Sequence, residues 1–289
     1  MDVNRISRRI ANLLQILIAI AHISIIYILR KARLTSPRYH LFSLLSFSDF
    51  LFAVNTLLFD MLIMEAKLQW DFIAVMISTF AYVYTMLTLQ ITIFITVDRL
   101  LAVKYSLRYN ILMNKKKINI FVGIAVMCNI LIYSILLHYG EEIYFVWPST
   151  MGTLIFTNVV RVMTMLTIII VGRITLNIRN KSEKSINRQI DMIHGQKAEK
   201  LTILRSLKRS VKDMAVLNFW TCAFLVPVTV TAFLYVVMNR LGSKEDLSKA
   251  VLFCAYALSI SNPFVYVLSQ TNLKQWLSQR YRVAVRSRT

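Results

Sequence analysis

The sequence is poor in glycine, proline, cysteine and acidic residues, and each shortage argues against a class of protein. Six glycines and four prolines among 289 residues are too few for a loop-rich fold or a barrel, so helices are favoured. The three cysteines form no CxxC pair and the four histidines are scattered, which argues against a disulfide framework and a zinc site. With 57% hydrophobic and only 17% charged residues, the chain cannot be a disordered one.

Long apolar segments take up most of the chain instead. Seven of them reach the length of about 18 residues that a helix needs to cross a bilayer. Period-two alternation is absent, and a backbone inside lipid must satisfy its own hydrogen bonds. We therefore predict an all-α membrane protein, a bundle of seven transmembrane helices in one domain over residues 1–289. The predicted spans are residues 10–29, 40–64, 72–97, 118–138, 153–176, 214–238 and 248–269.

The net charge of +20 is distributed unevenly between the two sides of this predicted bundle. Of the 34 basic residues, 26 fall in the loops after the first, third and fifth spans and in the tail, and seven fall on the other side. Because cytoplasmic loops carry an excess of Lys and Arg, the N-terminal residues 1–9 are predicted to be extracellular. The polar loop 177–212 and the tail 270–289 are then cytoplasmic. This distribution indicates contact with anionic membrane lipid and not with nucleic acid.

Polar residues inside the predicted spans indicate where function resides. Asp49 lies in the middle of the second span, where a carboxylate is costly and more often functional than structural. In the third span, four threonines and an arginine follow one another at intervals of three or four residues, so they share one stripe facing the bundle interior. An alternative is that the threonines only join helices, which explains the hydroxyls but not the arginine. The stripe consists of Thr85, Thr88, Thr92, Thr96 and Arg99.

The sixth and seventh spans each contain a proline, Pro227 and Pro263. Proline removes a backbone hydrogen bond and bends a helix, so two such helices beside a buried acid indicate a bundle with two alternative packings. Seven spans around Asp49 are also compatible with a channel or transporter, although no internal repeat is visible. No nucleophile stands with a base, so an enzyme is not expected.

These residues resemble the signature of rhodopsin-like (class A) G-protein-coupled receptors over roughly residues 10–282. Asp98-Arg99-Leu100 is similar to the D-R-Y motif, and residues 262–266, from Asn262 to Tyr266, match N-P-x-x-Y. The helix 2 motif of the family ends in a buried Asp, as residues 45–49 do here. The residues after the seventh span that resemble a short amphipathic helix along the membrane are Leu273, Trp276, Leu277 and Tyr281.

The resemblance implies a plasma-membrane receptor that converts binding of an extracellular small molecule or short peptide into activation of a heterotrimeric G protein. The residues that it implies for G-protein coupling and the activation switch are Asp98, Arg99, Pro227, Asn262, Pro263 and Tyr266. It implies a pocket for an allosteric sodium ion at Asp49, Thr88, Ser259 and Asn262. The candidate ligand contacts in the outer half of the bundle are Asp60, Tyr82, Thr85, Arg161 and Tyr256.

The type of ligand stays open. Tyr256 and Ala81 stand where opsins and amine receptors carry their Lys and Asp, which argues against both of these ligand classes. Asp60 and Arg161 are compatible with a mutual ion pair, with contact to lipid, or with binding of a zwitterion or peptide terminus. Nine residues before the first span favour a small molecule or short peptide over a large captured hormone.

The chain also departs from the family pattern, which makes it a divergent member. Ala21 and Leu225 replace the helix 1 Asn and the helix 6 Trp, and Ala74 rules out the usual outer disulfide. The helix 4 Trp and the helix 5 Pro and Tyr are missing. These losses keep open a third class of function, a receptor-like scaffold that has lost signalling.

One departure concerns the resting state of the implied switch. Lys208 and Arg209 stand where the family often places an acid opposite the helix 3 arginine, which leaves Asp98 as the obvious partner of Arg99. We therefore expect either a weakly locked resting state with appreciable basal signalling, or a lock made by other packing.

Overall fold

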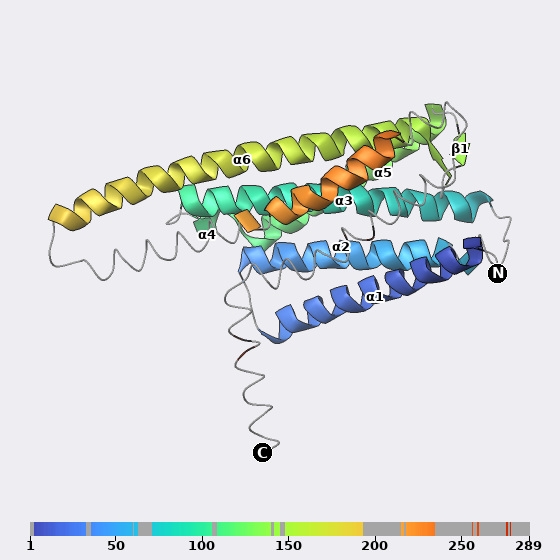
Figure 1. Ribbon diagram of the computed structural model, residues 1–289, viewed down its shortest axis with the longest axis horizontal. Coiled ribbons are helices and arrows are strands. Elements are labelled where there is room, and N and C mark those ends of the chain that lie inside the picture. Colours follow the sequence, from blue (N-terminus) through green and yellow to red (C-terminus); the bar gives the residue numbers. More distant parts are fainter. Residues whose placement is uncertain are drawn as a thin grey trace, which may run out of the picture.

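The computed structural model describes most of the N-terminal two thirds of the chain and one further helix. The described residues are 3–32, 36–59, 61–62, 71–105, 109–139, 142–144, 148–192, 215–216 and 218–234, with Tyr256, Ser259, Trp276 and Ser278. The helices are α1 (Val3–Lys31), α2 (Pro37–Phe59), α3 (Asp71–Lys104), α4 (Tyr109–Leu112), α5 (Lys115–Tyr139) and α6 (Met151–Met192) (Figure 1). A further apolar helix covers Asn218–Leu234.

Five helices are long and apolar enough to cross a membrane, namely α1, α2, α3, α5 and α6. They confirm the first five predicted spans. The helix Asn218–Leu234 lies inside the sixth predicted span. The seventh span and the amphipathic helix lie outside the described residues, apart from Tyr256 and Ser259 in the span and Trp276 and Ser278 beyond it.

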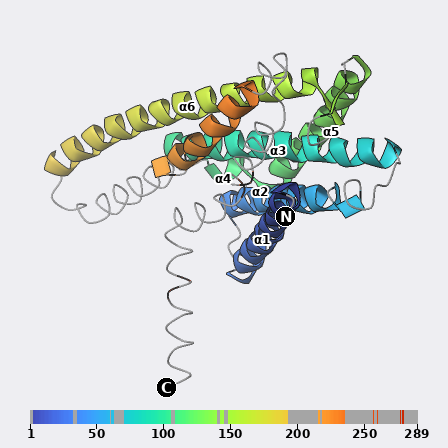
Figure 2. The same cartoon turned by 45° about the vertical axis from the view of Figure 1, so that its right-hand side comes forward.

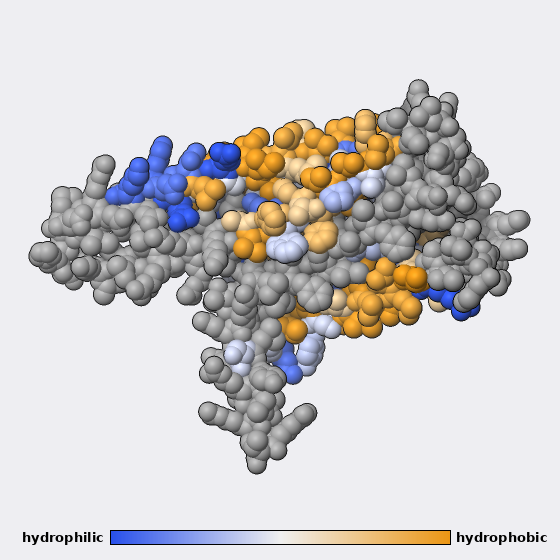
Figure 3. All heavy atoms as spheres, viewed as in Figure 1, coloured by the Kyte–Doolittle hydropathy of each residue, from blue (hydrophilic) through white to orange (hydrophobic). Residues whose placement is uncertain are grey.

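The side chains are arranged for a lipid surrounding. Large apolar residues face outward, among them Leu13, Ile124 and Met127, while polar groups such as Asp49 and Asp98 are buried. Figure 3 shows apolar side chains along the described part of the bundle, with hydrophilic side chains gathered where α6 extends beyond them. In a bilayer, apolar side chains lose no free energy by facing lipid. A helix bundle there is held together by packing and by internal polar contacts.

Helix α3 is the centre of the bundle. It packs against α2, α5 and α6, and α1 packs against α2; Figure 2 shows α3 between α2 and α6. One apolar cluster joins the first four long helices through residues such as Phe42 and Ile91. A second cluster joins α3 and α5 to the helix Asn218–Leu234 through Tyr82, Tyr133 and Leu225.

Three features differ from the sequence-based expectation. Between α5 and α6, the short strands β1 (Glu142–Tyr144) and β2 (Pro148–Thr150) pair antiparallel, with Ile143 opposite Ser149, which adds a small local feature to the helical fold. Strands of three residues are too short to produce a detectable period-two pattern. Helix α6 continues to Met192, past the predicted end of its span at residue 176, because residues 173–192 contain neither Gly nor Pro to stop it. The loop after α3 contains the single-turn helix α4.

Candidate activation and ligand sites

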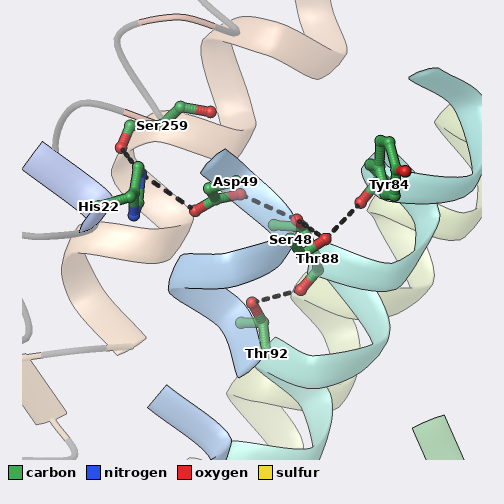
Figure 4. A network of polar contacts seen from close by, with 7 residues as sticks. All are labelled: His22, Ser48, Asp49, Tyr84, Thr88, Thr92 and Ser259. Carbon is green, nitrogen blue, oxygen red and sulfur yellow. Dashed lines mark hydrogen bonds and ion pairs between the residues drawn. The ribbon is translucent and has the colours of Figure 1, made fainter. Parts of the chain in front are cut away.

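A buried polar network surrounds Asp49 (Figure 4). Asp49 is 2% exposed, and Thr88 Oγ1 donates a hydrogen bond of 2.9 Å to its Oδ1. His22 Nε2 lies 3.7 Å from the second carboxylate oxygen and 3.1 Å from the backbone oxygen of Ser259. The network therefore links α1, α2, α3 and Ser259 of the seventh predicted span around one carboxylate.

Ser48 and Thr92 extend this network along α3. Ser48 Oγ donates to the backbone oxygen of Tyr84 at 3.2 Å and lies 3.3 Å from Thr88 Oγ1. Thr92 Oγ1 donates to the backbone oxygen of Thr88 at 2.8 Å. The Thr88 hydroxyl therefore lies between Asp49 and Ser48, and the Thr92 bond goes to the Thr88 backbone.

His22 is a residue that sequence reasoning missed. It is completely buried, and it stands one position after Ala21, where the family has its helix 1 Asn. The imidazole reaches both Asp49 and the seventh-span backbone, so it supplies a polar link from helix 1 despite the lost Asn. A sequence signal for His22 was its helical spacing of three or four residues from its neighbours on one face of α1, all of which the structure buries. This face consists of Gln15, Ile18, His22, Ile25 and Leu29.

The donor set around Asp49 fits a small monovalent cation. A carboxylate and a hydroxyl oxygen are brought together in a buried place, and the His22 imidazole lies near the acid. Ser259 is present through its backbone oxygen, which faces His22, and Asn262 lies outside the described residues. Sodium binding itself stays a prediction.

The second polar site is at the end of α3 that is predicted to be cytoplasmic. Arg99 Nε donates to Asp98 Oδ2 at 3.1 Å, and Nη2 of Arg99 donates to the same oxygen. Tyr109 of α4 donates its hydroxyl to the other oxygen, Asp98 Oδ1. Asp98 is completely buried and Arg99 is 6% exposed, so the ion pair is shielded from competing solvent.

Tyr109 is the second residue that sequence reasoning missed. Burial, together with the negative charge of Asp98, raises the pKa of Tyr109 above its ordinary value. The phenol therefore stays protonated at physiological pH and remains a donor to the carboxylate. The local sequence gives no indication that α4 turns Tyr109 back toward α3.

The remaining residues of the predicted switch are described only in part. Pro227 lies within the helix Asn218–Leu234, which continues through it. In the described part of that helix, Asn218 is joined to α3 by a long hydrogen bond of 3.5 Å from Thr96 Oγ1 to its Oδ1. The switch residues that lie outside the described part of the chain are Asn262, Pro263 and Tyr266.

The predicted threonine stripe has mixed roles. Thr96 and Arg99 are buried and the other three members are half-buried, as are most residues of this central helix, so exposure alone does not distinguish the stripe from the other faces of α3. Two members bond the backbone of α3 itself: the Thr85 hydroxyl donates to the backbone oxygen of Ala81, and the Thr92 hydroxyl donates to that of Thr88. Among the described residues, the side chains of Thr88 and Thr96 bond another helix, so the joining function applies to part of the stripe.

The candidate ligand contacts fall into two groups. The ring of Tyr82 packs at a tilt against that of Tyr133 of α5, with ring centroids 4.8 Å apart. Arg161 of α6 is 9% exposed and donates to Asn158 at 2.9 Å. Tyr256 instead packs against α1 and α2 and accepts a hydrogen bond from Gln15. Asp60 lies outside the described residues.

Together these features define a class of protein: a multi-pass helical membrane protein with a buried acid at its centre and a shielded Asp–Arg pair at one end. The family model for the 7 transmembrane receptor (rhodopsin family) matches residues 22–266, so the chain belongs to this family. This is a family of receptors and not of enzymes. No curated protein sequence matches the chain.

Proposed function

We propose that this receptor resides in the plasma membrane with its N-terminus outside and converts binding of an extracellular small molecule or short peptide into activation of a heterotrimeric G protein. The observation that carries the proposal is the buried cluster of Asp98, Arg99 and Tyr109 at the end of α3. An arginine held in this way can be released when the neighbouring helix moves.

The resting state follows from that cluster. Arg99 is held by the adjacent carboxylate, and Tyr109 holds the carboxylate in turn. The long Thr96–Asn218 bond is a weak tie to the helix that carries Pro227. The lock is therefore built within α3 and α4, and the helix with Pro227 is free to swing away once a ligand favours the open packing.

A ligand supplies the energy for this change by binding the open packing more tightly. Shifting the equilibrium from 1:99 to 99:1 takes about 5.5 kcal/mol of differential affinity, and a partial shift takes proportionally less. In the open state Arg99 would contact the G protein, with Tyr266 moving inward to support it, as the family resemblance implies.

The Asp49 network is the candidate brake on this change. We propose that a sodium ion held by Asp49 and Thr88, together with Ser259 and Asn262, stabilises the resting packing. His22 has its Nε2 directed at the same carboxylate, so it limits the space open to the ion. Replacing sodium with a bulky organic cation should then raise agonist affinity; unchanged affinity would exclude the ion.

The test is G-protein recruitment to the purified full-length chain, measured with tethered G-protein chimeras of each class. We expect Arg99→Ala to abolish recruitment and the matched variant Arg30→Ala, an exposed basic residue at the end of α1, to leave it unchanged. A channel or transporter would instead show ion flux that is insensitive to Arg99→Ala. A scaffold without signalling would recruit no chimera at verified surface expression.

A further inference from the structure

Helix α6 has a buried polar face in its first half. Within a span in which many apolar residues face lipid, such as Val159 and Met163, four polar side chains are at most 9% exposed. Their spacing of one, three and three residues keeps them on one side of the helix. They are Thr157, Asn158, Arg161 and Thr164. This face is turned toward the bundle, where α6 packs against α3.

Arg161 is the cation on that face, and no described acid matches its charge. A guanidinium has five N–H donors, and among the described residues Arg161 has one hydrogen bond, from Nη1 to the neutral amide oxygen of Asn158 at 2.9 Å. Among the described residues no carboxylate pairs with it. Arg99, the other described buried arginine, is bound by Asp98. A cation kept inside a membrane without an internal anion is costly and is expected to serve a function.

A second donor without a partner lies on α3. Tyr82 is 8% exposed, and its hydroxyl is buried without a hydrogen-bond partner in the structure. Tyr82 belongs to the apolar cluster that Val160, the neighbour of Arg161, joins from α6. Two donors without partners among the described residues, one charged and one neutral, therefore lie on two helices that pack against each other, and both helices contribute to an apolar cluster that includes Met86 and Leu225.

We propose that the ligand of this receptor is a carboxylate with an apolar body. The carboxylate pairs with the Arg161 guanidinium and accepts a hydrogen bond from the Tyr82 hydroxyl, while the apolar body lies against the cluster around Tyr133. Asn158 is a positioning residue, because it holds the guanidinium on the inner face of α6. This inference rests on the proposed function. It names the anion chemistry shared by two sources, a small carboxylic acid and the C-terminus of a short peptide.

The first test needs no ligand. We compare the melting temperatures of the purified full-length wild type and Arg161→Gln, with Arg99→Gln as the matched control. An unmatched cation destabilises the ligand-free bundle, so Arg161→Gln should melt at or above the wild type. Arg99→Gln should melt lower, because it leaves Asp98 without its cation. A lower melting temperature for Arg161→Gln would overturn the proposal, since it would mean an internal anion such as Asp60.

The second test uses defined probes. The purified wild type is heated with 3-phenylpropionate or its amide, and with a tripeptide ending in phenylalanine whose C-terminus is free or amidated. We expect at least one free acid to raise the melting temperature where its amide does not. A response to 3-phenylpropionate would indicate a small carboxylic acid as the ligand, and a response to the tripeptide would indicate a peptide C-terminus. Arg161→Gln should lower the affinity for that acid at least about tenfold, because a charge-assisted bond is lost. Arg173→Gln, an exposed arginine on the same helix, should not.

The two proposals fail separately. If neither free acid stabilises the wild type more than its amide, or if Arg161→Gln binds the acid equally well, the carboxylate site is overturned. Tyr82→Phe gives a second measure, since it should lower the affinity for the acid without lowering the melting temperature of the ligand-free protein. If acid binding is as expected but no G protein is recruited, the site stands and the proposed signalling function fails.

Discussion

Replacing His22 with alanine should destabilise the receptor more than the loss of an ordinary membrane hydrogen bond. The imidazole is completely buried and bridges from α1 to Asp49 of α2 and to the backbone of Ser259. The residue stands one position from the place where the family has its Asn. If the imidazole replaces that Asn as the polar contact from helix 1, His22→Ala removes the contacts of α1 with Asp49 and with Ser259 in one step.

The magnitude follows from the contacts. A side-chain hydrogen bond in a membrane contributes about 0.6 kcal/mol on average and about 1.7 at most, which covers the 3.1 Å contact of His22 with Ser259. Removing the completely buried imidazole also leaves a cavity beside Asp49, which adds about 1–3 kcal/mol. We therefore expect His22→Ala to cost about 2–4 kcal/mol, a large part of the stability of a typical domain.

The assay is thermal unfolding of the purified chain, measured with and without sodium. His40→Ala is the matched control, because His40 bonds Asn119 near the end of α2, where water can replace the contact. The double variant Ala21→Asn/His22→Ala puts the family's Asn back and should recover part of the loss. A His22→Ala protein that melts within the error of the wild type would refute the reasoning. A larger sodium effect in His22→Ala than in the wild type would show that imidazole and ion compete for Asp49.

Two further predictions concern contacts that sequence reasoning did not anticipate. Tyr109→Phe removes the donor to Asp98 and should raise ligand-free second-messenger signalling at equal surface expression, whereas an unchanged basal level would mean that the Asp98 contact is no lock. Gln90 and Asn129 bond each other reciprocally at 3.1 and 3.0 Å. Substituting either residue by leucine should cost about 1–2 kcal/mol of stability, because the amide of the other is left without its partner inside the bundle. The double leucine variant should cost less than the sum of the two. Additive losses in a double-mutant cycle would contradict that pairing.

The periodicity of single helices was predictable, whereas contacts between helices were not. Hydropathy over about 18 residues was enough to find α1, α2, α3, α5 and α6, and the spacing of Thr88 and Arg99 was enough to place them on the inner face of α3. A pairing such as Gln90 with Asn129 joins residues 39 positions apart on different helices. Helical period does not encode which neighbour an inward-facing side chain meets, so such pairs require the packed bundle.

The polar contacts of this bundle bear on whether the lost family residues mean lost signalling. Where the helix 1 Asn is absent, His22 reaches Asp49 from the next position. Where the helix 4 Trp is absent, Asn129 of α5 makes a reciprocal bond to α3. Where helix 6 lacks an acid for the α3 arginine, Tyr109 holds its carboxylate partner. A scaffold released from signalling would have no need of a buried, shielded ion pair at the end of α3, since apolar side chains pack there at lower cost. Retention of the pair alongside these substitute contacts therefore favours a working switch.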